Sequence, residues 1–132
     1  MKFRKIIKIF LSIAMIFTLG SCSDTTKDTF TYEQISAEQA KAIMDSETNY
    51  VIIDARTQSE FDEGHIPGAI LMPEYEVAQR AESELLDKNQ LILVYCRSGR
   101  RSKIAAQALV DLGYTNVKEF GGIIDWKYDT VK

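Results

Sequence analysis

Two continuous apolar runs constrain the fold of this chain more than any other feature of its sequence. They are "YVIID" at residues 50–54 and "QLILVY" at residues 90–95. A run of this kind, without polar alternation, is typical of a strand that is buried on both faces of a parallel sheet. Because parallel strands are joined by crossovers that are usually helical, the segments around these runs should contain helices.

The remaining segments supply these helices and further short strands. Helices are predicted over residues 37–45, 58–62, 74–86 and 102–112, the last two from the spacing of their apolar residues. Two of these helices follow capping boxes, Ser36 with Gln39 and Thr57 with Glu60. Shorter strands are predicted before residue 36, at 69–72 and at 116–120. This alternation predicts an α/β fold of three layers, in which a mostly parallel central sheet of about five short strands has helices on both faces.

The N-terminus has the pattern of a bacterial lipoprotein signal. Basic residues in "MKFRKIIK" precede an apolar stretch of about 11 residues, which is short of the ~20 needed to span a bilayer. The stretch ends in "LGSC" (19–22), which resembles the lipobox whose cysteine becomes lipidated. We therefore expect three parts: a signal peptide at 1–21, the lipidated Cys22 with its tether at 22–29, and a folded domain at 30–132. An uncleaved anchor helix and an ordinary secreted protein are the alternatives.

The charge of the chain limits its partners. The whole chain has a formal net charge of −3, and residues 1–21 carry four basic and no acidic side chains, so a mature chain would have a charge of −7. This acidic balance argues against nucleic acid and against broad adsorption to anionic lipid. We expect an exported monomer that lipid holds to the bacterial cell envelope, on the periplasmic side or at the outer membrane where there are two membranes.

The chain has two cysteines, Cys22 and Cys96. In an exported protein, a disulfide between them is the default expectation. If Cys22 is acylated, however, it cannot pair, and Cys96 is the only thiol of the folded domain. Cys96 is predicted directly after the strand at 90–95, at the edge of the sheet where parallel α/β folds bind ligands. Position alone makes it a candidate site residue.

The loop "CRSGRRS" (96–102) surrounds this thiol with features that bind anions. Ser98 and Gly99 permit a tight turn, and inward-pointing backbone N–H groups with a helix N-terminus form an anion-binding concavity. Together with three arginines, they should lower the pKa of the thiol and leave it as a thiolate. Cysteine-dependent phosphatases place an arginine six residues after the cysteine, where this chain has Ser102. The shorter loop favours sulfur over phosphorus, and a buried structural cysteine is the alternative.

Three separated blocks resemble one family. They are "DARTQSEFDEGHIPGA" (54–69), "CRSGRR" (96–101) and "GGIIDW" (121–126), and together they resemble the single-domain rhodaneses. The resemblance implies a rhodanese-like fold and a thiosulfate or persulfide sulfurtransferase. It also implies covalent catalysis without a metal or organic cofactor.

The resemblance also implies roles for individual residues. Cys96 would be the nucleophile that takes the outer sulfur of an anionic donor, becomes a persulfide and passes the sulfur to a thiol or to cyanide. The loop amides would stabilise this persulfide. Arg97 and Arg100 would hold the sulfonate of thiosulfate, and Arg101 would hold the loop in shape. The whole loop consists of Arg97, Ser98, Gly99, Arg100 and Arg101.

Other polar residues are given structural roles. Asp54, His65 and Trp126 are expected to support the fold, and Arg56 to bond with Asp54, with a second role for Arg56 at the pocket mouth left open. Two further functions stay open beside the enzyme. One is a persulfide carrier or sulfur-sensing module for one partner protein, with little turnover of thiosulfate. The other, disfavoured by the loop length, is a phosphatase or arsenate reductase.

Overall fold

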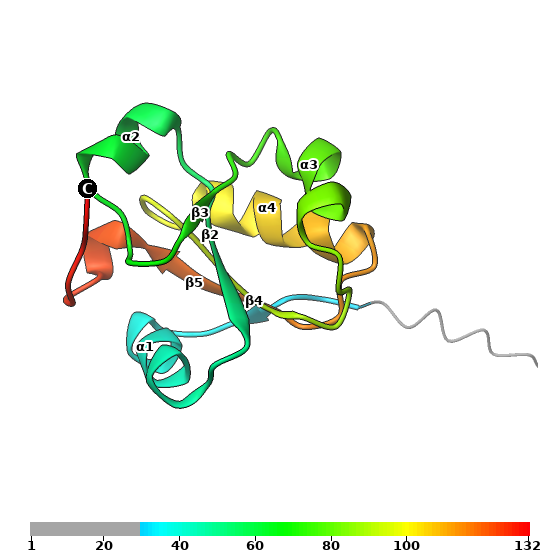
Figure 1. Ribbon diagram of the computed structural model, residues 1–132, viewed down its shortest axis with the longest axis horizontal. Coiled ribbons are helices and arrows are strands. Elements are labelled where there is room, and N and C mark those ends of the chain that lie inside the picture. The colour runs from blue at the N-terminus through cyan, green and yellow to red at the C-terminus, as the bar shows by residue number, and fades with distance from the viewer. Residues whose placement is uncertain (1–29) are drawn as a thin grey trace, which may run out of the picture.

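The computed structural model describes residues 30–132, so the predicted signal peptide, Cys22 and the tether lie outside the described residues. The helices and strands that it contains are shown in Figure 1. In chain order they are β1 (Glu33–Gln34), α1 (Ala37–Ser46), β2 (Tyr50–Asp54), α2 (Gln58–Glu63), β3 (Ile70–Leu71), α3 (Val77–Glu84), β4 (Leu91–Cys96), α4 (Arg100–Asp111), β5 (Val117–Gly122) and the 3₁₀ turn η1 (Ile123–Asp125).

All five strands pair in parallel, in the order β1-β5-β4-β2-β3. The two predicted apolar runs are β2 and β4, and β4 lies at the centre of the sheet. The register between β4 and β5 shifts between Val94 and Cys96, and this shift places Cys96 opposite Gly122. The predicted α/β fold with a five-stranded parallel sheet is confirmed.

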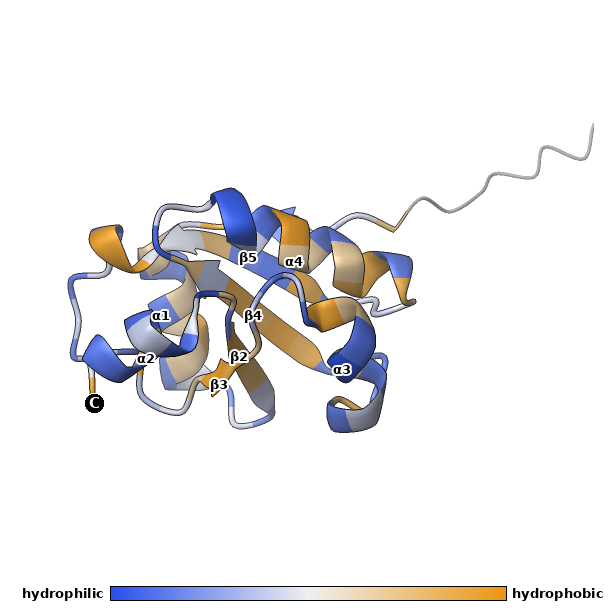
Figure 2. Ribbon diagram, turned by 90° about the horizontal axis from the view of Figure 1, so that it is seen from above, coloured by the Kyte–Doolittle hydropathy of each residue, from blue (hydrophilic) through white to orange (hydrophobic). Residues whose placement is uncertain are grey.

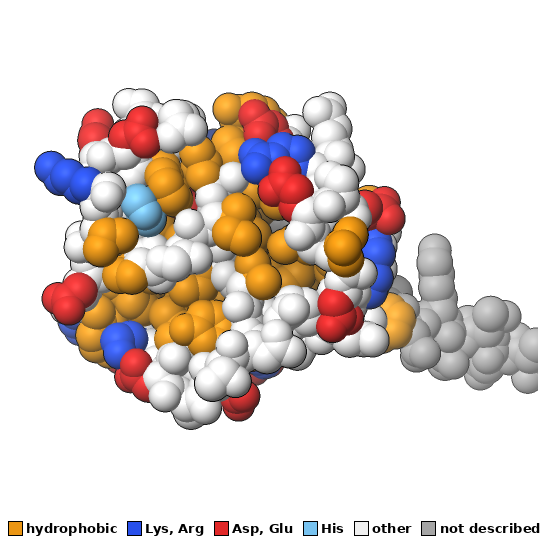
Figure 3. Space-filling view, viewed as in Figure 1, with side chains coloured by type: hydrophobic (Ala, Val, Ile, Leu, Met, Phe, Trp, Pro, Cys, Tyr) orange, Lys and Arg blue, Asp and Glu red, His pale blue; other side chains and the backbone are white. Residues whose placement is uncertain are grey.

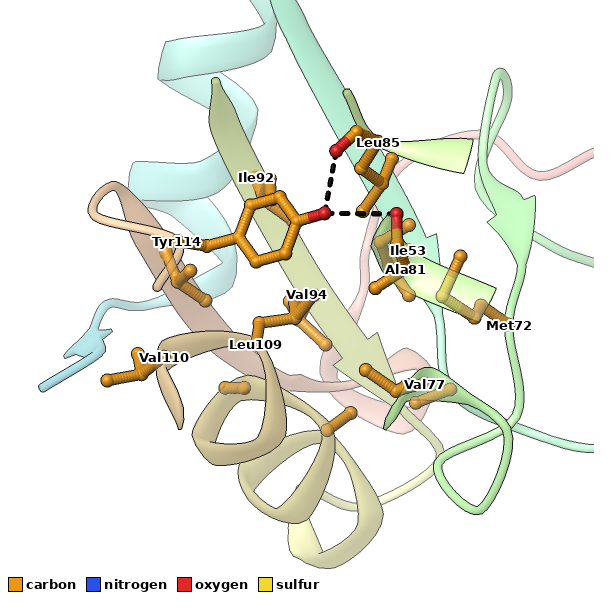
Figure 4. Packing of buried hydrophobic residues seen from close by; sticks show 14 of the residues in the cluster. Ile53, Met72, Val77, Ala81, Leu85, Ile92, Val94, Leu109, Val110 and Tyr114 are labelled. Atoms are coloured by element: carbon orange, nitrogen blue, oxygen red, sulfur yellow. Dashed lines mark hydrogen bonds between the residues drawn. The ribbon is translucent and has the colours of Figure 1, made fainter. Parts of the chain in front are cut away.

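Helices cover both faces of the sheet, with α1 below it and α3 and α4 above it in the view of Figure 1. One buried cluster packs β2 and β4 against α3 and α4, and a second packs them against α1 and η1. Figure 2 shows hydrophobic colours along β4, between helices that carry hydrophilic stretches. In Figure 4, the Tyr114 hydroxyl points at two carbonyl oxygens of the α3 end, 2.6 Å from that of Leu85 and 3.0 Å from that of Ala81.

Local sequence signals fix several helix ends. Both predicted capping boxes form, at Ser36 before α1 and at Thr57 before α2. Beyond α4, Gly113 has a φ of +95°, and its N–H donates to the Val110 carbonyl while the Tyr114 N–H donates to the Leu109 carbonyl. This is a Schellman end, which turns the chain from α4 toward β5.

Some predicted boundaries are wrong. Cys96 is the last residue of β4 rather than the residue after the strand. The following helix begins at Arg100 instead of 102, because Gly99 takes the N-cap position with a φ of +104°. The third helix begins at Val77 instead of 74, because the preceding residues form a turn in which the Glu76 N–H donates to the Pro73 carbonyl.

The surface of the described domain is mixed in charge. On the face shown in Figure 3, Lys and Arg side chains lie separately among Asp and Glu side chains and apolar ones. They form no continuous basic patch on that face. Within residues 30–132, no helix has the length and apolar character that a membrane crossing requires.

Candidate active site

Cys96 lies at the carboxyl edge of the central strand, where the chain leaves β4 and enters α4 within three residues. The residue is fully buried, and the Gly99 N–H donates to its Sγ atom at 3.0 Å. The φ of +104° at Gly99 lies in the left-handed region, where a side chain is strained. Glycine therefore lets the loop curl back over the thiol.

The loop makes this thiol acidic. Burial raises the pKa of Cys96, but hydrogen bonds from the Ser102 hydroxyl and from loop amides outweigh it, so the pKa lies below its ordinary value. The amides are those of Ser102, Gly99 and Ser98. The groups that lower the pKa of the thiol are thus a hydroxyl and backbone N–H groups, whereas the sequence predicts a contribution from the arginines as well.

Ser102 and Glu119 are two polar residues of this site that the sequence analysis missed. The Ser102 Oγ atom lies 3.4 Å from Cys96 Sγ and 2.6 Å from Glu119 Oε1, and both residues are buried. In the sequence, Ser102 stands out only as the position where phosphatases have an arginine. A glutamate inside the apolar strand pattern "NVKEF" was the signal that could have pointed to Glu119.

The three arginines of the loop are placed differently. Arg101 donates from both terminal nitrogens to the Glu60 carboxylate, at 2.7 and 2.8 Å. This hydrogen bond is the largest cause that lowers the pKa of Glu60 to about 2. Arg97 and Arg100 are exposed, and within residues 30–132 neither has a carboxylate at ion-pair distance. Two arginines are therefore free to bind an anion, while the third ties α4 to α2.

The glycine pair after Phe120 lies directly against the loop. A Cβ atom at Gly122 would be 1.9 Å from the Arg97 carbonyl oxygen and 2.5 Å from the Ser98 nitrogen, so only glycine fits. The Ile124 N–H also donates to the Arg97 carbonyl, at 3.3 Å. The "GGIIDW" block thus forms the surface on which the thiol loop rests.

Asp54 and Arg56 form a buried ion pair. The Arg56 side chain donates from Nε and Nη2 to the Asp54 carboxylate at 2.7–3.1 Å, and Nη2 also donates to the Gly64 carbonyl. Asp54 also accepts from the Tyr95 hydroxyl at 2.6 Å, and burial together with this carboxylate raises the pKa of Tyr95 above its ordinary range. The Arg56 side chain is buried, with Nε and Nη2 bonded to Asp54 and Gly64, and its second role at the pocket mouth stays a prediction.

His65 and Trp126 are also held by structural contacts. The His65 Nδ1 atom lies 2.9 Å from the Phe61 carbonyl oxygen, and the two rings stack with centroids 3.6 Å apart. Trp126 is half-buried, packs against Phe120 and donates from Nε1 to the Asp129 carbonyl at 3.2 Å. Neither residue is hydrogen-bonded to Cys96 in the described part of the chain.

Comparisons with known proteins agree with this geometry. The family model for the "Rhodanese-like domain" matches residues 36–129. The chain is 39% identical over 80 residues to the thiosulfate sulfurtransferase PspE of Escherichia coli K12, covering 61% of this chain and 77% of PspE. It is 37% identical over 94 residues to the putative sulfur carrier protein YrkF of Bacillus subtilis 168, covering 70% of this chain but only 50% of YrkF.

A solved structure is also similar. It is a rhodanese with anions from E. coli, which matches this chain with a TM-score of 0.60 at 37% sequence identity. The match covers 63% of this chain and 98% of that one.

Proposed function

Because the chain belongs to the rhodanese-like domain family, we propose that it is a sulfurtransferase that carries a sulfane sulfur on Cys96 as a persulfide. The donor is thiosulfate or a persulfide or polysulfide, and the acceptor is a thiol, or cyanide in an assay. One observation supports this most directly: the Sγ atom of Cys96 accepts a loop N–H at 3.0 Å, next to two exposed arginines that have no ion-pair partner among residues 30–132.

The proposed transfer has two steps. In the first, the Cys96 thiolate attacks the sulfane sulfur of thiosulfate, a bond forms between the two sulfurs, and sulfite leaves with the electron pair of the broken S–S bond. Arg97 and Arg100 offset the negative charge of the donor. In the second step, an acceptor thiolate attacks the same sulfur and Cys96 leaves as a thiolate. The charges balance in both steps, so no oxidant, reductant or metal is required.

The burial of the thiol sets a condition on the first step. Cys96 has no exposed surface, whereas Arg97 and Ser98 beside it are exposed. A donor therefore reaches Sγ only when the atoms that cover the thiol move aside. This restricted access also favours a second candidate function, a persulfide carrier that receives sulfur from one partner protein and turns over little thiosulfate. The similarity to a protein named as a putative sulfur carrier supports that alternative.

Steady-state turnover of thiosulfate with cyanide distinguishes the two functions. For the enzyme, we expect saturable turnover that Cys96→Ser abolishes, and a rise of about tenfold in KM for thiosulfate in Arg97→Ala, because a charge-assisted hydrogen bond of roughly 1.5 kcal/mol is lost. Arg80→Ala is the control, since Arg80 pairs with Glu76 and Glu84 on α3. Turnover too slow to saturate, in a protein that accepts sulfur from another persulfide protein, would support the carrier instead.

We also propose that lipid on Cys22 anchors the protein to the cell envelope after export. The basic start, the apolar stretch and "LGSC" support this proposal. In bacterial cells fed a labelled fatty acid, the wild-type chain should carry the label and fractionate with membranes. Cys22→Ala should lose the label. Unlabelled wild-type protein in the soluble fraction would overturn the anchor.

A further inference from the structure

Glu119 on β5 is a buried carboxylate beside the thiol, and the transfer described above does not use it. Glu119 is only 3% exposed. Its Oε1 atom accepts hydrogen bonds from the Ser102 hydroxyl at 2.6 Å and from the Gly121 N–H at 2.8 Å. Within residues 30–132, no Lys or Arg lies at ion-pair distance from it, whereas the buried Asp54 has Arg56. A buried carboxylate without a cation is costly when charged, and a proton removes that cost.

The hydroxyl of Ser102 links Glu119 to the thiol. A serine hydroxyl has one hydrogen to donate, and the Ser102 Oγ atom lies between Glu119 Oε1 and Cys96 Sγ, at 2.6 and 3.4 Å. When Cys96 is a thiol, its S–H points to Ser102, whose own hydrogen then serves the Glu119 carboxylate. When Cys96 is a thiolate, the Ser102 hydrogen is needed at Sγ. The Ser102–Glu119 hydrogen bond then persists only if Glu119 carries a proton.

We propose that Glu119 holds the proton that Cys96 gives up, and that Ser102 relays it. In this step the Sγ–H bond and the Ser102 O–H bond break, while a new Ser102 O–H bond and a Glu119 Oε1–H bond form. The negative charge moves from the carboxylate to the sulfur, and no electron is transferred to another molecule. Glu119 is thus a positioning residue, because it acts on the reacting sulfur only through Ser102.

The surroundings of Glu119 give its proton a route to solvent. Glu119 lines a pocket of about 380 Å³ between the thiol loop, the β1–α1 segment and η1. The other charged residues that line it are Lys103 of α4 and Asp125 of η1. The remaining lining from this side comes from Gln34 of β1, Ala37 of α1, and Ile35 and Ser36 between them. On the side of Cys96, the loop carries the exposed Arg97 and Arg100, and Arg101 pairs with Glu60.

The relay has a consequence for the anionic donor. With the proton on Glu119, the resting site holds a thiolate but no second negative charge beside it. An anion such as thiosulfate then meets one less repelling charge than it would if both groups were ionised.

Infrared difference spectra on alkylation of Cys96 test the relay without any sulfur donor. The full chain carrying Cys22→Ala is treated with iodoacetamide near neutral pH, so that Cys96 is the only thiol. We expect the C=O band of one carboxylic acid to disappear and a carboxylate band to appear, because the alkylated sulfur no longer stabilises the proton on Glu119. Glu119→Gln should abolish both changes, and its amide oxygen can still accept from Ser102 and Gly121.

Two further variants locate the effect. Asp125→Asn removes an exposed carboxylate from the same pocket and should leave the difference bands unchanged. Ser102→Ala should remove them, since the sulfur and the carboxyl group no longer share a hydrogen-bonded chain. If alkylation changes no carboxylic acid band in the otherwise wild-type protein, or if the change persists in Glu119→Gln, the relay is wrong. The inference rests on Cys96 as the reactive thiol of the proposed function, but neither result here decides whether a persulfide forms.

Discussion

The loop over Cys96 depends on the absence of one methyl group, at Gly122. The backbone of Gly122 has a φ of −136°, which any residue can adopt, so conformational freedom does not explain the glycine. Its cause is the Arg97 carbonyl, which a Cβ atom would approach to 1.9 Å. Because this Cβ atom would collide with backbone atoms of Arg97 and Ser98, the clash is relieved only if the loop moves.

Gly122→Ala should therefore displace the thiol loop and lower kcat/KM with thiosulfate at least a hundredfold. Such a loss is expected when a reacting group is misplaced by about 1 Å. The control is Gly113→Ala, which has no atom within 4 Å of its new Cβ and suffers only from a φ of +95°. That control should lose about 1 kcal/mol of stability and keep its kcat/KM. Equal activity of the two variants would contradict the packing role of Gly122.

At this scale, the sequence predicted only part of the site. Cys96 and its arginine loop are contiguous, so their spacing alone pointed to a thiol in an anion-binding turn. Ser102 and Glu119 are 17 positions apart. They meet because Ser102 lies at the start of α4, directly after β4, and β4 pairs with β5 through a register that shifts beside Cys96. A shift of this kind leaves no mark on apolar periodicity, so the sequence could not bring Glu119 to the thiol.

At the scale of elements, one ion pair joins the start of α4 to α2. Arg101 and Glu60 form it with two hydrogen bonds, and both side chains are mostly shielded from solvent. Glu60 also closes the capping box at the start of α2, where it accepts from the Thr57 N–H. The sequence predicted this capping box, because it is local, but not the pairing with Arg101, which is 41 residues away in the chain.

This ion pair predicts a dependence of stability on pH. The pKa of Glu60 is lowered from 4.5 to about 2 in the folded protein, so the unfolded state binds more protons between these values. The contribution of the pair is then fully present above about pH 4.5 and is lost as pH falls toward 2. Glu60→Gln should cost about 1 kcal/mol in the free energy of unfolding at pH 7, and much less near pH 2.5.

Urea denaturation at the two pH values measures this difference. Glu63→Gln is the control, since Glu63 is an exposed carboxylate in the same helix. If Glu60→Gln destabilises the protein equally at both pH values, the loss comes from the cap or from packing rather than from the charge pair.

At the scale of the whole molecule, the strand order positions the thiol. β4 is the central strand, and its carboxyl end is flanked by the ends of β2 and β5. β2 supplies the buried Asp54–Arg56 pair, and β5 supplies Glu119 and the glycine pair on which the loop rests. The alternation of apolar runs and helical patterns was enough to predict this layered sheet. Exact ends of helices were not, because they depended on turns at Pro73 and Gly99.

The central claim is that Cys96 carries the transferred sulfur, and intact mass tests it most directly. The full chain with Cys22→Ala, in which Cys96 is the only thiol, is incubated with thiosulfate and compared with the chain that also carries Cys96→Ser. We predict a gain of one sulfur atom that cyanide removes and that the Cys96→Ser protein lacks. No gain in mass, while Cys96 remains free and titratable, would contradict thiosulfate as a donor; a gain that persists in Cys96→Ser would contradict the role of Cys96 itself.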